Sequence, residues 1–356
     1  MGRRGSAYVF ASVQKPHPVR KAVLWIFLTL VILSLLFLGA GLLTSRSVHF
    51  ERQYVTIDNL PETLKGFRIL HLSDLHGATY GSGQAAIGNA LQGVNYHCVV
   101  MTGDMLGPNG EDKPLLQLLD QLSLPVPIYY CPGDEDTSYL DSVGHGVATP
   151  YSEWAYELTQ RGVEILDRPK LITRASGKAR IWFIPDGVMT MDLDSETSTL
   201  QARRRTIELS GGQDAGLRVA DYELARLQEI RASIEDMRDG DIFVLVSHIP
   251  LTADTVAMRN EGSTRADLFS TRQASLVLSG HLCAGQFRLP GLGAVSVPGY
   301  GSFPEDELIT GMTWQAGVQQ YISPGLGASS IYPWWAFFRL FNPPVVTQLV
   351  LTDSLT

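Results

Sequence analysis

The chain begins with one long apolar segment and continues as short apolar runs separated by amphipathic stretches. Residues 22–43 read AVLWIFLTLVILSLLFLGAGLL and contain no charged side chain. As a helix, this segment is about 33 Å long, which matches the hydrocarbon core of a bilayer. The pattern predicts a transmembrane helix over 22–43, since the apolar region of a cleavable signal peptide is normally shorter. Cleavage near Gly39 or Gly41 is the alternative.

Charged residues flank this segment unequally. No acidic residue precedes it, and five basic residues do: Arg3, Arg4, Lys15, Arg20 and Lys21. After it, Arg46 and Arg52 are partly balanced by Glu51. Because basic residues stay on the cytoplasmic side, we expect a single-pass protein of the cell membrane with a cytoplasmic N-terminus, 1–21. The rest would lie outside the cytoplasm, beginning with an extended stalk over 44–55.

From residue 56 onward, the apolar runs have the length and composition of strands. They are rich in β-branched and aromatic residues and apolar on both faces, as in sheets covered on both sides. These runs are 67–73, 97–102, 127–131, 180–185, 241–247 and 274–279. Helices are predicted between them, over 83–94, 113–122, 151–161 and 217–238. The alternation predicts one α/β (α+β) layered domain over 56–356.

Composition and charge indicate a globular protein and argue against some classes of function and partner. A content of 45% hydrophobic and 18% charged residues is that of a globular protein. The net charge of −8 argues against nucleic acid as a partner, and the basic triplet 203–205 is predicted to be a solvated loop or a helix start. Three widely spaced cysteines, Cys98, Cys131 and Cys283, predict no disulfide framework.

Acidic residues, histidines and one cysteine follow five of the predicted strands. In chain order they are Asp74 and His76, Asp104, Asp134 and Glu135, His248, and His281 and Cys283. Taken singly, each is an ordinary turn residue. Because ligands gather at the carboxyl ends of strands in layered α/β folds, we expect these side chains to converge. Their oxygen and nitrogen donors suit divalent metals, so the pattern predicts a metal site.

The order of these motifs resembles that of the calcineurin-like metallophosphoesterases, and in particular their membrane-anchored bacterial branch. The resemblance is carried by D-x-H within PETLKGFRILHLSDLH (61–76), G-D, G-D-E, an isolated histidine after a strand, and G-H-x-C-x-G-Q. YISPGLGASS (321–330) and RLFNPPVVTQLVL (339–351) extend it to the C-terminus. The resemblance implies a four-layer αββα sandwich with two divalent cations at one end, after one transmembrane helix.

The resemblance also implies the ligands of both cations, which would be Mn, Fe, Zn or Mg. One would be held by Asp74, His76, Asp104 and the position of Cys283, and the other by Asp104, Asp134, His248 and His281. Asp104 would bridge the two, because a carboxylate can bind both ions. A hydroxide between the cations would then attack phosphorus. The catalytic positions implied are Asp104, Glu135 and His248.

Two departures from the family pattern lie at this site. Glu135 stands where relatives have the histidine that protonates the leaving oxygen, and it would replace that acid only if crowding by Asp134 and Asp136 raised its pKa. Cys283 stands where relatives have a histidine ligand. A thiolate binds Zn²⁺ or Fe²⁺, whereas a buried thiol after a turn needs no metal, and both interpretations stay open. Asp134, in place of asparagine, keeps an oxygen ligand.

These observations lead to two hypotheses of function. The first is a membrane-anchored, metal-dependent phosphohydrolase that cleaves a phosphoester or pyrophosphate bond of a small-molecule, lipid or envelope substrate. The second is a catalytically impaired homologue that binds ligands or serves as a scaffold on the same fold. The aromatic run 331–338 would line an acyl groove, touch the membrane interface or pack within the domain. The oligomeric state is open.

Overall fold

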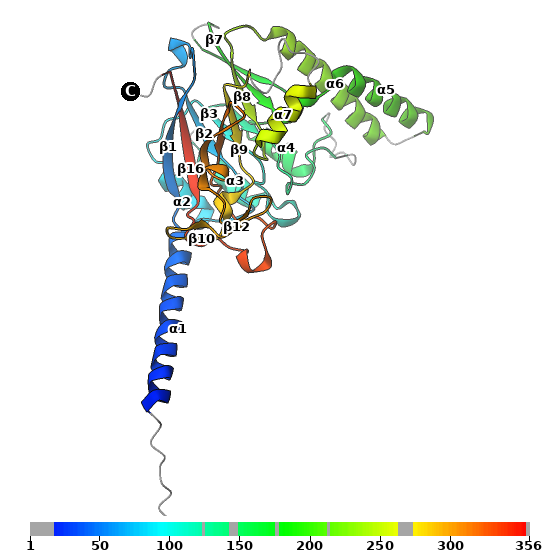
Figure 1. The fold of residues 1–356 in the computed structure, drawn as a ribbon. Coiled ribbons are helices and arrows are strands. Elements are labelled where there is room, and N and C mark those ends of the chain that lie inside the picture. The colour runs from blue at the N-terminus through cyan, green and yellow to red at the C-terminus, as the bar shows by residue number, and fades with distance from the viewer. Residues whose placement is uncertain are drawn as a thin grey trace, which may run out of the picture.

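The apolar N-terminal segment forms a single long helix that projects from the domain. The computed structural model describes residues 18–122, 125–141, 149–174, 178–211, 214–262 and 273–353. α1 (Pro18–Thr44) is almost entirely exposed and meets the domain near its C-terminal end, where Gly41 is buried (Figure 1). Its length and composition suit a membrane anchor or a signal sequence.

Two six-stranded mixed sheets form the centre of the domain. In spatial order, the first contains β1 (His49–Thr56), β16 (Val345–Thr352), β2 (Arg68–Leu72), β3 (Cys98–Met101), β4 (Ile128–Tyr130) and β5 (Val163–Ile165). The second contains β14 (Gly311–Gln315), β15 (Val318–Ile322), β9 (Leu276–Ser279), β8 (Ile242–Val246), β7 (Ala179–Pro185) and β6 (Lys170–Arg174). Two small hairpins pair β10 (Arg288–Leu289) with β11 (Gly293–Ala294) and β12 (Ser296–Val297) with β13 (Gly301–Ser302).

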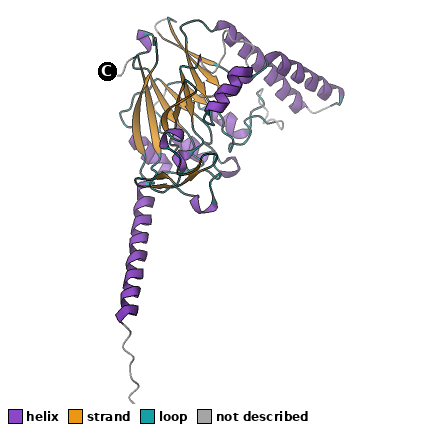
Figure 2. Cartoon of the chain, viewed as in Figure 1, coloured by secondary structure: helices purple, strands orange, loops and turns teal. Residues whose placement is uncertain are grey.

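Three apolar clusters arrange these elements in four layers. One cluster lies between the sheets and includes Ile69, Val100, Phe183 and Val244. A second packs α2 (Ala85–Ala90), α3 (Lys113–Leu119) and α4 (Glu153–Gln160) on the outer face of the first sheet. A third packs α5 (Leu193–Leu209), α6 (Asp214–Asp236) and α7 (Ala253–Gly262) against the second. The αββα sandwich is therefore confirmed, with helices outside both sheets (Figure 2).

The predicted strands and helices are present, with ends shifted by a few residues, and several further elements join them. Residues 44–55 were expected to form an extended stalk. Instead, Thr44 ends α1, a turn follows, and the residues from His49 onward belong to β1, which pairs along its whole length with β16. The basic triplet 203–205 lies within α5, where Arg204 forms ion pairs with Asp221 and Glu208. β5, β6 and the strands after residue 285 also complete the architecture.

The strand directions bring the candidate residues to one edge. β2, β3 and β4 run parallel, as do β7, β8 and β9. The loops that leave β2, β3 and β4 therefore open at the same edge of the first sheet. Loops after β8 and β9 meet them there, since Gly280 N–H donates to the His248 carbonyl and His281 N–H donates to Asp74.

Candidate metal centre

All eight candidate residues lie in one cluster at this edge. Donor atoms fall into groups in which every atom lies within 4.8 Å of the others. The first group is Asp74, His76 and Cys283, and the second is Asp104, Asp134, His248 and His281. A third combination, His76 with Asp104 and Glu135, links them. The division follows the ligand sets that the family resemblance implies.

The first group is closed to solvent. Asp74 and Cys283 have no exposed surface, and the His76 side chain is 7% exposed. His76 Nε2 lies 3.9 Å from Asp74 Oδ1 and 3.8 Å from the Cys283 sulfur. The sulfur therefore points into the cluster, as the ligand interpretation of Cys283 requires.

The second group is tighter and more open. Asp134 Oδ1 lies 2.8 Å from His248 Nε2 and 3.1 Å from His281 Nδ1. His248 Nδ1 lies 2.6 Å from the Thr102 carbonyl oxygen, so this nitrogen carries the proton in a neutral imidazole. Nε2 then presents its lone pair to the carboxylates, which is the arrangement of a metal-ligating histidine.

Two buried carboxylate oxygens have no hydrogen-bond partner among the described residues, namely Asp74 Oδ2 and Asp104 Oδ2. Leaving such an oxygen without a partner is costly. Asp104 Oδ2 lies between the groups, 3.0 Å from His248 Nε2 and 3.9 Å from His76 Nε2. These residues fit divalent cations, because a cation is the partner that both oxygens lack.

The electrostatics of the cluster point the same way. Burial raises the pKa of Asp74, since its charged form is desolvated. Burial lowers the pKa of His76, but the Cys283 sulfur and the Glu135 carboxylate outweigh this effect and raise it to about 11. At His248, Asp104 and Asp134 likewise outweigh burial and raise the pKa well above its usual value. The buried carboxylates are therefore stabilised by nearby positive charge. Either protons on the histidines or divalent cations can supply that charge.

Several candidate residues have a strained backbone conformation. The left-handed conformation, uncommon outside glycine, occurs at five of the eight positions: Asp74, His76, Asp104, His281 and Cys283. Gly133 and Gly280 allow the loops to approach: a Cβ at Gly133 would lie 2.1 Å from Asp104 Oδ1, and one at Gly280 1.8 Å from Ser73 Oγ. Such strain concentrates at functional sites, where the surrounding structure enforces it.

The family model of the calcineurin-like phosphoesterases matches residues 67–285, which is more than half of the chain. The chain belongs to this family. The matched span contains all eight candidate residues. A solved structure, a phosphopantetheinyl hydrolase from Mycobacterium tuberculosis, is similar with 16% identity and a TM-score of 0.33, covering 73% of this chain and 89% of that one. No curated protein matches the chain.

Glu135, which the family resemblance marks as a departure from the expected histidine, has three defined partners in the structure. Its Oε1 accepts a hydrogen bond of 2.5 Å from Ser329, its Oε2 accepts one of 3.1 Å from Ser330, and Oε2 lies 3.5 Å from His76 Nδ1. His76 and the serines hold the pKa of Glu135 down, to about 2, although partial burial opposes them. The condition for an acid role, a raised pKa, is therefore not met.

Asp136 also belongs to this site, although its position in the sequence predicted only that it would crowd Glu135. It accepts hydrogen bonds from the backbone N–H groups of Asp104, Gly133 and Leu106. These contacts fix the loop that carries Asp104. Ser329 and Ser330 end the stretch YISPGLGASS (321–330), but nothing in their spacing indicates that they bind Glu135.

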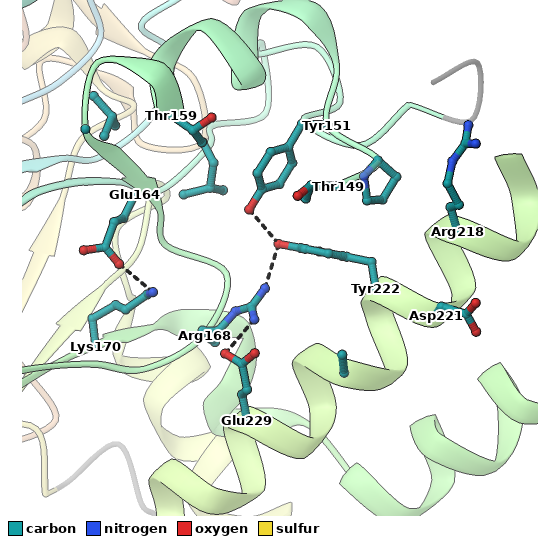
Figure 3. A pocket seen from close by; sticks show the side chains of 15 residues that line it. Thr149, Tyr151, Thr159, Glu164, Arg168, Lys170, Arg218, Asp221, Tyr222 and Glu229 are labelled. Atoms are coloured by element: carbon teal, nitrogen blue, oxygen red, sulfur yellow. Dashed lines mark hydrogen bonds and ion pairs between the residues drawn. The ribbon is translucent and has the colours of Figure 1, made fainter. Parts of the chain in front are cut away.

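A pocket of about 630 Å³ lies between β5, β6 and α6, and none of the eight candidate residues lines it (Figure 3). Most of its charged side chains are paired, although the Arg218 Nε atom has no hydrogen-bond partner among the described residues. Arg168 pairs with Glu229 and with the adjacent Asp167, and Lys170 pairs with Glu164. In the candidate metal centre, by contrast, the buried atoms without a hydrogen-bond partner among the described residues are carboxylate oxygens, which suit a cation, and for that reason we place the chemistry there.

Proposed function

We propose that the chain is a membrane-anchored, metal-dependent phosphohydrolase that cleaves a phosphoester or pyrophosphate bond. The single observation that carries this proposal is the position of Asp104 Oδ2. This buried carboxylate oxygen lies between two groups of donor atoms, 3.0 Å from His248 Nε2, and has no hydrogen-bond partner among the described residues. In a calcineurin-like phosphoesterase, this is where two cations would share a ligand. Asp74, His76 and Cys283 would complete the first ion's ligands, and Asp134, His248 and His281 the second's.

The ligand chemistry differs between the two positions. Sulfur and imidazole donors at the first favour Zn²⁺ or Fe²⁺, whereas the second, with two carboxylates and two imidazoles, also suits Mn²⁺. Burial raises the pKa of the Cys283 thiol, so a cation is needed to hold it as the thiolate. Because Cys283 is fully buried, its sulfur is shielded from oxidants outside the cytoplasm.

When bound, two divalent cations would supply Lewis-acid catalysis, activating water and neutralising charge on the phosphate. The protein's own residues would position them: Thr102 orients His248, and Asp136 fixes the loop of Asp104. Asp134, whose side chain is 46% exposed, marks the side from which a phosphate enters. His76 and the two serines lower the pKa of Glu135, so the leaving oxygen would take its proton from solvent.

Membrane attachment through α1 is the second part of the proposal. Its support is the apolar helix that projects from the domain and the basic residues that precede it. These basic residues would remain in the cytoplasm, with α1 in the cell membrane. The catalytic domain would then lie outside the cytoplasm. A phosphorylated small molecule or lipid would be the substrate, and nucleic acid would not.

The test uses the full chain in detergent micelles, loaded separately with Mn²⁺, Fe²⁺ and Zn²⁺. Hydrolysis of bis(p-nitrophenyl) phosphate and p-nitrophenyl phosphate is measured for the natural chain, for Asp104→Ala and for Asp254→Ala, an exposed aspartate of α7. We expect Asp104→Ala to abolish metal-dependent hydrolysis and Asp254→Ala to retain it. Metal binding without hydrolysis under any loading would contradict the proposal and favour a catalytically impaired binding protein.

A further inference from the structure

The register of the first sheet places the metal centre at the end of the domain where α1 enters. β1 starts at His49, five residues after α1 ends, and His49 pairs with Val345 of β16. Two residues further along β16, Thr347 pairs with His71, near the carboxyl end of β2. Asp74 follows β2 directly. The cluster of candidate ligands therefore lies at the end of the sandwich where α1 enters. The opposite end is marked by Thr56, the last residue of β1, about 25 Å from His49 along the strand.

The segment before β16 packs against the last turns of α1. Rings of Phe341 and Phe37 lie 4.6 Å apart, and Phe341 N–H donates to the Gly41 carbonyl over 3.4 Å. The contact depends on glycine, because a Cβ at Gly41 would lie 2.3 Å from Leu340 Cδ1. Since Phe37 precedes the helix end at Thr44 by seven residues, this contact reaches about 10 Å down the helix.

Three large aromatic side chains of the same segment are exposed. They are Trp334 at 86%, Phe337 at 73% and Trp335 at 38%, and we call them the aromatic face. Figure 1 places their turn, Trp334–Ala336, on the side of the domain from which α1 projects. Tryptophan is enriched at membrane–water interfaces, whereas exposed apolar clusters are uncommon on soluble surfaces.

The aromatic face has a rigid base that continues into the metal centre. Tyr332 is buried and donates a hydrogen bond of 2.5 Å to the Leu282 carbonyl, next to Cys283. Ala336 is buried, and its carbonyl accepts from Gln286. Only two residues upstream of Tyr332, Ser330 contacts Glu135. One continuous segment thus links the rim of the metal centre to the aromatic face and then to α1.

We propose that the aromatic face inserts into the interface of the bilayer that holds α1, so that the metal centre takes its phosphate from a lipid headgroup. The inference rests on the proposed function, because it needs both the anchor and the metal centre. The surface that contacts the aromatic face is the bilayer. The reason is that the face adjoins α1, the only described helix that is long and apolar enough to cross a membrane. No basic residue belongs to the face, so binding depends on aromatic insertion and requires no anionic lipid.

The position of the aromatic face is tested by fluorescence. The full chain with Trp25→Phe is reconstituted in phosphatidylcholine vesicles with or without bromine on the acyl chains near the headgroup, which quenches nearby tryptophans. We expect the double variant Trp334→Phe/Trp335→Phe to lose most of the quenchable emission. Trp314→Phe is the matched control: Trp314 is 65% exposed, but its partner Gln319 contacts Thr56, at the far end from α1. Unchanged quenching in the double variant, as when a second copy or another protein covers the face, would overturn the inference.

The substrate class is tested with lipid-borne phosphates in the same vesicles: phosphatidic acid, phosphatidylglycerol and a polyprenyl diphosphate. We expect Trp334→Ser/Phe337→Ser to lower hydrolysis of the accepted lipid by about tenfold or more, because burial of two aromatic side chains is lost. Its rate on soluble p-nitrophenyl phosphate should not change. Hydrolysis of the soluble ester alone, or equal loss on both, would overturn the inference and leave the proposed function standing. Hydrolysis of neither by the natural chain would reject both.

Discussion

The two donor groups of the metal centre differ in exposure and in the atoms they contain. The first is sealed, with Asp74 and Cys283 fully buried, and it contains the sulfur. The second reaches solvent through Asp134 and His281, whose side chains are 46% and 16% exposed. Cys283 therefore lies in the more buried group, and under the proposed function a substrate would meet the second group first.

Removing one ligand from each group should have the largest effects and tests most strongly whether the two groups bind separate ions. We expect His248→Ala to lose the second ion and to lower hydrolysis by about a thousandfold, since a bound cation contributes several kcal/mol to the transition state. Cys283→Ser should lose the first ion while keeping the second. Metal analysis of both variants checks this expectation, and Co²⁺ loading adds a thiolate-to-metal absorption band that only Cys283→Ser abolishes. Loss of both ions from each variant would show one undivided site.

A smaller effect is expected at Glu135. Its contact with His76 Nδ1 resembles the carboxylate that orients a metal-ligating histidine, so we expect Glu135→Gln to weaken metal binding at the first group by about tenfold to a hundredfold. Binding at the second group should not change. Competition with a chromophoric chelator measures both affinities, and Glu164→Gln, in the distant pocket, is the control. Equal weakening at both groups would remove the distinction between them.

A substitution in the pocket of Figure 3 should have the smallest effect on the rate of hydrolysis. Arg168→Met breaks a largely buried pair with Asp167, so the free energy of unfolding should fall by about 3 kcal/mol. Metal content and the rate of hydrolysis of the folded variant should not change. Chemical denaturation and the phosphoester assay provide these values. A loss of hydrolysis without a loss of stability would move the substrate site toward this pocket.

The sequence predicted six strands that are apolar on both faces, but it missed the buried β16 and the strands in which hydrogen bonds satisfy buried polar side chains. Strands β2, β3, β8 and β9 are apolar on both faces and were found. β15, which reads VQQYI, was missed because Gln320 is buried and satisfied by the distant Leu251 backbone. No local pattern contains such a partner. α5 was missed because its sequence is mostly polar.

The residues of the site were predictable, but the interactions of Glu135 were not. Strand-end positions and motif order identified all eight side chains that the structure brings together. Adjacent charges suggested that Asp134, Glu135 and Asp136 crowd one another. In the structure they turn to different partners: His248, Ser329 and a set of backbone amides. Ser329 lies almost two hundred residues away along the chain, so its contact with Glu135 exists only in the folded protein.

Counting metal ions tests the central claim most directly. The full chain is purified in detergent without chelators, saturated with Zn²⁺ or Mn²⁺, freed of unbound metal and analysed by mass spectrometry of the elements. The account predicts two ions per chain, falling to none or one in Asp104→Ala, which removes the shared carboxylate. A natural chain that binds no metal, or Asp104→Ala that still binds two ions, would contradict it.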